Sequence, residues 1–163
     1  MDTIENLADR LAQALALIGA IGVAALLLHV AADVASRNLL DRPIPATNEI
    51  ASRYYMVALA FLPLAWVERR GGMVRVEFFE AVASPGLMRV SEILVALLAT
   101  AVYFVLAGVT WADALGNWRI GAFVDVLGRQ VAVWPTYFLP PTGFALAGAV
   151  TLLRAVTVLL RGT

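Results

Sequence analysis

Three ionisable residues recur at helical spacing near the end of the first long apolar stretch. His29, Asp33 and Arg37 lie four residues apart, which places them on one face of a helix. This spacing predicts an ion pair between Asp33 and Arg37, with His29 in hydrogen-bonding reach of Asp33. The row is compatible with a proton relay or a ligand contact. A satisfied polar cluster at a helix end is favoured, because paired charges there need only interfacial water or snorkelling.

A second charged pair opens the next apolar stretch. Glu49 and Arg53 are again four residues apart, and Thr47 with Asn48 is suited to capping a helix that begins there. Together with the earlier pair they predict a charged belt that ties two helices together or contacts a partner protein. Catalysis is disfavoured, because neither a nucleophile nor a set of metal ligands accompanies these residues.

Several kinds of chemistry are excluded by residues that the sequence lacks. With no Cys and a single His, the chain cannot form a disulfide relay, a thiolate metal site or bis-histidine haem ligation. Its 12 basic residues, all Arg, balance 12 acidic residues, so nothing favours nucleic acid as a partner. We therefore expect no catalytic residue, metal site, substrate site or cofactor in this chain.

The composition requires a membrane rather than water around the protein. The chain has 163 residues, of which 61% are hydrophobic and only 15% charged. A helix needs about 20 apolar residues to cross a hydrocarbon layer about 30 Å thick. We predict an all-α integral membrane protein with four transmembrane helices and short interfacial amphipathic helices. The predicted spans cover residues 11–32, 49–67, 93–111 and 131–153.

The connections predict an orientation and further local structure. Seven Arg fall on one side of the predicted spans and five on the other, which favours cytoplasmic termini. The amphipathic stretches 69–89 and 113–130 are predicted to lie in the membrane interface, the first as a helix. Pro140 and Pro141 predict a kink in the fourth span. Close helix contacts are expected at small residues, including Gly19, Gly22, Gly108 and Gly143.

Three segments resemble one family of membrane proteins. DVASRNLLDRPIPATNEIASRY (33–54) combines an Arg that closes helix one, a Pro-x-Pro turn and a Glu that opens helix two. RRGGMVRVE (69–77) is similar to the family's Gly-His and Val-Asp pattern, with Met73 and Glu77 at the His and Asp positions. VWPTY (133–137) before PPTG (140–143) resembles the entry into its fourth helix. That family is the small membrane subunit of tripartite ATP-independent periplasmic (TRAP) transporters.

The resemblance implies a specific setting for the chain. It implies a four-helix protein of the bacterial inner membrane, bound to a large membrane transport subunit that carries substrate and sodium. A periplasmic substrate-binding protein would deliver a small organic acid, and lipid would surround the complex. The charged set Asp33, Arg37, Glu49 and Arg53 would then serve structure or partner contacts, with His29, Arg75 and Glu77 as weaker candidates.

Two other classes of protein stay open at this stage. A small membrane enzyme or electron carrier would need cofactor ligands, which the sequence does not offer. An independent four-helix exporter would need to transport alone, although the chain lacks the inverted repeats of many self-sufficient transporters.

Overall fold

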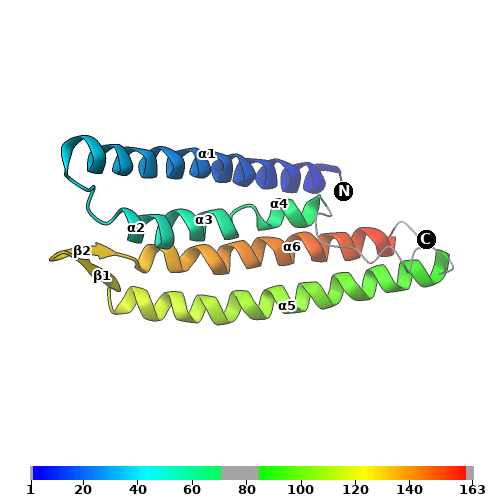
Figure 1. Cartoon of the computed structure of the whole chain (residues 1–163). Coiled ribbons are helices and arrows are strands. Elements are labelled where there is room, and N and C mark those ends of the chain that lie inside the picture. Colours follow the sequence, from blue (N-terminus) through cyan, green and yellow to red (C-terminus); the bar gives the residue numbers. More distant parts are fainter. Residues whose placement is uncertain (1, 71–84, 161–163) are drawn as a thin grey trace.

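The computed structural model describes residues 2–70 and 85–160, and it confirms four helices of membrane-spanning length (Figure 1). They are long and apolar enough to span a membrane over Gln13–Leu40, Thr47–Arg69, Gly86–Arg119 and Trp134–Leu160. The helices reach beyond the expected segments, because the first continues to Leu40 and the last to Leu160. The predicted all-helical membrane fold is therefore confirmed, and its helices are longer than the apolar runs alone indicated.

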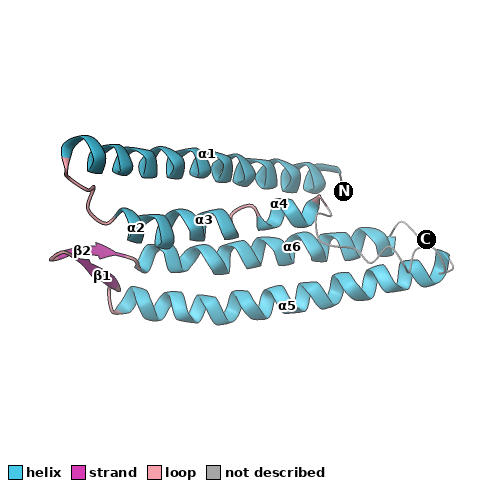
Figure 2. Ribbon diagram, viewed as in Figure 1, coloured by secondary structure: helices cyan, strands magenta, loops and turns pink. Residues whose placement is uncertain are grey.

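The second and fourth spans are each built from more than one helical piece (Figure 2). In chain order the elements are α1 (Asp2–Leu40), α2 (Thr47–Ile50), a π-helical turn (Ala51–Tyr55), α3 (Met56–Phe61), α4 (Leu64–Arg69), α5 (Pro85–Arg119), β1 (Phe123–Val126), β2 (Arg129–Ala132), a 3-10 turn (Trp134–Phe138) and α6 (Leu139–Leu160).

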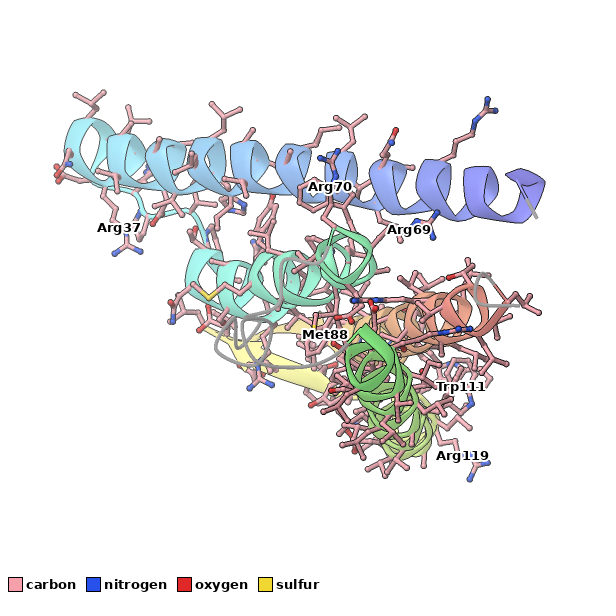
Figure 3. All side chains as sticks on the ribbon, turned by 90° about the vertical axis from the view of Figure 1, so that its right-hand side faces the viewer. Arg37, Arg69, Arg70, Met88, Trp111 and Arg119 are labelled. Atoms are coloured by element: carbon pink, nitrogen blue, oxygen red, sulfur yellow. The ribbon has the colours of Figure 1, made fainter. Side chains whose placement is uncertain are left out.

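The spans form an open array rather than a closed bundle. α1 packs against α2, α3 and α4, whereas α6 packs against α3, α4 and α5. Figure 1 shows the resulting order, with α1 at one edge and α5 at the other, and Figure 3 shows α1 set apart from α5 and α6 in the end view. Successive spans run in opposite directions. The start of α1 and the end of α6 therefore lie at the same end of the array.

Small residues make the contacts between helices. The buried hydrophobic residues are mostly alanines, and many Leu, Val and Ile side chains are exposed. A Cβ added at Gly143 would lie 2.5 Å from the Phe61 carbonyl oxygen, and one at Gly19 would lie 3.1 Å from Pro63 Cγ. The hydrophobic effect does not drive helices together in hydrocarbon, so van der Waals contact at small residues stabilises their packing. Of the predicted glycines, Gly108 does not take part, since nothing lies within 4 Å of its added Cβ.

The two prolines of the fourth span do not kink it as predicted. The 3-10 turn precedes α6, so Pro140 and Pro141 fall in the first turn of that helix. Amides in a first turn lack intrahelical acceptors, and a proline there removes no hydrogen bond. The proline that does interrupt a span is Pro63. The last backbone hydrogen bond before the interruption runs from the Leu62 amide to the Ala58 carbonyl oxygen. The next runs from the Val67 amide to the Pro63 carbonyl oxygen, and both are 2.9 Å long.

The stretch 113–130 forms no interfacial helix. α5 continues to Arg119, and the chain then makes a two-stranded antiparallel hairpin in which Val126 pairs with Arg129. Leu127 and Gly128 form the two-residue turn with φ values of 52° and 78°, as a type I′ hairpin turn requires. The Gly128 amide donates to Asp125 Oδ1 at 3.0 Å. The interfacial helix predicted in 69–89 lies mostly in 71–84, outside the described residues.

Candidate functional site

Asp33 organises the connection between the first two spans. Its buried carboxylate accepts a hydrogen bond from Arg37 Nε at 2.9 Å, which confirms the predicted ion pair. Its other oxygen accepts the backbone amide of Ile44 at 2.7 Å, eleven residues along the chain. The carboxylate thus links the last turns of α1 to the segment that enters α2.

Further hydrogen bonds fix this connection. The Ser36 hydroxyl donates to the Arg42 carbonyl, and the Arg42 amide donates back to the Ser36 carbonyl at 3.3 Å. The predicted capping by Thr47 is wrong, because its hydroxyl donates to the Ile44 carbonyl at 3.0 Å. Ala46 occupies the N-cap position with φ of 63° and offers no side-chain acceptor. Reciprocal bonds and a left-handed residue therefore define this turn.

The predicted Glu49–Arg53 ion pair is absent from the part of the chain that the structure describes. The π-helical turn begins between the two residues, and its closing bond runs from the Met56 amide to the Ala51 carbonyl five residues back. This wider turn changes the spacing on which an i, i+4 pair depends. Arg53 is exposed and Glu49 is half-buried, so both are accessible to a partner.

His29 does not join the polar row predicted for it. Its ring meets Tyr55 edge to face, with centroids 5.8 Å apart and an interplanar angle of 86°. The oxygens of Asp33 are bound by Arg37 and Ile44 instead. No hydrogen-bonded relay from His29 to Asp33 exists among the described residues. The remaining weak candidates, Arg75 and Glu77, lie outside them.

The same end of the array is braced by aromatic residues. The Tyr54 hydroxyl donates to the Ala132 carbonyl and so joins the π-helical turn to the hairpin. Phe138 meets Trp111 at 5.6 Å and Trp134 at 6.4 Å between ring centroids, each edge to face. Aromatic rings with polar tips are typical of a membrane interface. These contacts hold the hairpin to the ends of the spans.

Sequence reasoning missed the polar contacts between distant helices. Arg154 pairs with Glu92 across α5 and α6, and the buried hydroxyls of Thr100 and Thr151 lie 2.8 Å apart. Arg89 donates to the carbonyl oxygens of Val158 and Leu159 at 3.2 and 2.8 Å. These residues lie 51 to 70 positions apart in the chain, so no helical spacing could reveal them.

The Tyr103 hydroxyl donates to Glu68 Oε2 at 3.2 Å, a second contact that the sequence did not indicate. Glu68 immediately follows the predicted end of the second span at residue 67. It is a polar contact between α4 and α5, which lie far apart in the sequence.

These sites join helices and offer no evident centre for chemistry. Within residues 2–70 and 85–160, no group of three His, Asp or Glu residues is placed to hold a metal ion. The polar residues bind one another, the backbone or the ends of neighbouring helices. Asp33, Thr47, Thr100, Thr136 and Thr151 are the buried polar residues of this part of the chain, and each has a hydrogen-bond partner.

Four helices with apolar exteriors, whose buried polar groups are satisfied in the part of the chain that the structure describes, define an integral membrane protein. Residues 26–161 match the family described as tripartite ATP-independent periplasmic transporters, DctQ component. The chain therefore belongs to this family, the small Q component of TRAP transporters. No individual curated protein matches the sequence significantly.

Proposed function

We propose that this chain is the scaffold subunit of a sodium-coupled, binding-protein-dependent importer of small organic acids or related solutes. It supports the large transport subunit in the bacterial inner membrane and binds neither substrate nor sodium itself. Its termini face the cytoplasm. The hairpin and the connection between α1 and α2 then face the periplasm, where the substrate-binding protein docks. The chain catalyses no reaction.

The open array is the observation that carries this proposal. In the most apolar windows of α1 and of the second span, only 6% of residues are buried within the chain. Most side chains of these helices are thus available to lipid or to another subunit. A carboxylate substrate would need a cation or helix N-termini at membrane depth, and sodium would need several converging oxygen atoms. The described residues support bracing of a partner better than transport alone.

The charged residues near the periplasmic end suit the same role. Asp33 and Arg37 tie α1 to the start of the second span, while the guanidinium end of Arg37 stays accessible, with the side chain 57% exposed. Glu49 and Arg53 form no pair with each other. We assign Arg37, Glu49 and Arg53 to contacts with the partner proteins, and Asp33 to positioning Arg37.

Reconstitution tests the proposal directly. Liposomes that contain this chain alone should show no uptake of organic acids, and calorimetry of the purified chain should show no heat of substrate binding. Addition of the large subunit, the substrate-binding protein and an inward sodium gradient should produce uptake. Omission of this chain should abolish it. Saturable substrate binding by the chain alone, or full transport without it, would refute the scaffold role.

A further inference from the structure

The end of the second span lies deeper in the array than the ends of its neighbours. α4 ends at Arg69, while the start of α5 and the end of α6 extend well beyond it in the same direction (Figure 1). Figure 3, viewed from this end, labels Arg69 and Arg70 there. The charged residues that close α4 therefore lie beside parts of α5 and α6 that are still apolar.

Tyr103 gives the depth of Glu68 relative to α5. It follows Glu92 by 11 residues and precedes Asp113 by 10, and no charged residue lies between those two. At about 1.5 Å per residue along the helix axis, Tyr103 is roughly 16 Å from Glu92 and roughly 15 Å from Asp113. A helical side chain points back toward the N-terminus of its helix, so the hydroxyl lies roughly two turns from Glu92. Glu68, which accepts its hydrogen bond, lies inside the apolar layer.

α6 supports the same depth. The Tyr103 ring lies 6.3 Å from the ring of Phe144. Phe144 is 10 residues after Trp134 and 10 before Arg154, so it lies midway between these two polar residues. The Tyr103 Cβ also approaches Gly148, whose added Cβ would lie 3.2 Å away. Two independent helices thus place the Tyr103–Glu68 contact away from the charged ends of the array.

No cation among the described residues balances Glu68. Its Oε2 receives the neutral Tyr103 hydroxyl, and its Oε1 has no partner in the described part of the chain. On its own helix, the Arg70 guanidinium lies over Trp66 at 5.2 Å. On α6, Arg154 pairs with Glu92.

α1 does not balance the carboxylate either, since residues 14–28, which include Gly19 at the contact with Pro63, contain no titratable side chain. Arg69, next to Glu68 in sequence, has an interaction of its own. A carboxylate at this depth with a single neutral donor is costly, and such residues mark contacts with partners or pathways.

We propose that Glu68 is the interaction site for a basic side chain, Arg or Lys, from a membrane-spanning helix of the large transport subunit. This inference rests on the proposed function, which supplies that subunit as the partner. Tyr103 orients the carboxylate through Oε2 and leaves Oε1 for a charged donor. Glu68 is half-buried, so one side stays accessible. Long Arg and Lys stems lie readily along apolar surface, and a charge-assisted bond is stronger where water is scarce.

The test separates the contact with a partner from the internal contact with Tyr103. Glu68→Gln removes the costly charge but keeps an oxygen that accepts the Tyr103 hydroxyl, so the unfolding midpoint of the isolated chain should not fall. Its affinity for the large subunit should fall on the order of tenfold or more, measured by co-purification across a detergent titration. Tyr103→Phe should do the reverse, lowering the unfolding midpoint while the complex persists. Asp113→Asn, an exposed carboxylate change on α5, is the matched control and should leave both unchanged.

A charge reversal identifies the partner. Glu68→Lys should abolish co-purification, and selection for restored transport should return Arg or Lys to Asp or Glu changes in a membrane-spanning helix of the large subunit. Unchanged affinity of Glu68→Gln, or suppressors confined to this chain, would overturn the proposal. A loss of affinity that depends only on lipid composition would assign Glu68 to a lipid headgroup and also overturn it. If the unaltered chain and Asp113→Asn both fail to co-purify, the proposed function itself fails.

Discussion

Gly143 on α6 lies directly against the carbonyl oxygen of Phe61 at the end of α3. A Cβ at position 143 would stand 2.5 Å from that oxygen and 3.0 Å from the Phe61 Cβ. The contact comes immediately before the interruption at Pro63, and the Phe61 and Phe144 rings meet beside it at 5.2 Å. Gly19 receives the Pro63 ring on the opposite side. The interrupted helix is thus held between two glycines, one on α1 and one on α6.

Gly143→Ala should therefore destabilise the chain. The new methyl group meets backbone, which cannot turn aside as a flexible side chain can, so α6 must move away from α3. Overpacking of this kind costs about 1–3 kcal/mol. Gly108→Ala is the control, because its added Cβ meets nothing within 4 Å. Denaturant titration in detergent micelles should show a lower midpoint for Gly143→Ala only. Equal midpoints would show that the two helices do not pack as closely as described.

Removal of Arg37 should harm assembly more than removal of the whole ion pair. Arg37→Ala leaves Asp33, whose side chain is 7% exposed, without its cation. An unpaired buried charge costs about 3 kcal/mol, more than the pair itself contributes. The double variant Asp33→Asn/Arg37→Ala removes both charges but keeps an oxygen that accepts the Ile44 amide. We expect the single variant to lower the yield of the complex first, before substrate affinity changes, and the double variant to recover part of it.

A different pattern would revise the role of the ion pair. If the single and double variants lose the same amount of complex, the contact of the guanidinium with a partner accounts for the whole loss, and Asp33 does not position Arg37. Normal assembly with altered substrate preference would instead assign Arg37 to a ligand.

Sequence reasoning succeeded where contacts are local or set by composition. Apolar runs of membrane length gave the four helices, and the four-residue interval gave the Asp33–Arg37 pair. The same four-residue interval wrongly predicted a Glu49–Arg53 pair, because nothing in the sequence reveals the π-helical turn that begins between these residues. A four-residue interval therefore predicts an ion pair only where the helix is a regular α-helix.

The remaining errors have separate physical causes. The kink predicted at Pro140 depends on where α6 begins, and a 3-10 turn shifts that start to Leu139. The hairpin was missed because Leu127-Gly128 is not one of the common turn pairs, such as Asn-Gly. The Tyr103–Glu68 contact joins two residues 35 positions apart in the chain, and it depends on how the second and third spans are placed in the fold.

The orientation can be tested because the natural chain has no Cys. Single cysteines at Asp41, in the connection after α1, and at Gly86, near the start of α5, should mark opposite ends of the array. With cytoplasmic termini, an impermeant thiol reagent added to intact cells should label Asp41→Cys, and Gly86→Cys should react only after the membrane is opened. Labelling of Gly86→Cys alone from outside would invert the orientation. Labelling of both from outside would refute the four-span topology.

The hairpin turn offers a test in which one substitution stabilises and its neighbour destabilises. Leu127 has φ of 52°, a left-handed conformation that costs a Leu side chain about 1 kcal/mol or more, whereas Asn tolerates it. Leu127→Asn should therefore slow hydrogen exchange of the amides in β1 and β2. Gly128→Ala should accelerate it, because Gly128 has φ of 78°. Gly116→Ala, in α5 with open space around its added Cβ, should leave the hairpin unchanged. Faster exchange in Leu127→Asn would mean that the turn does not have this geometry.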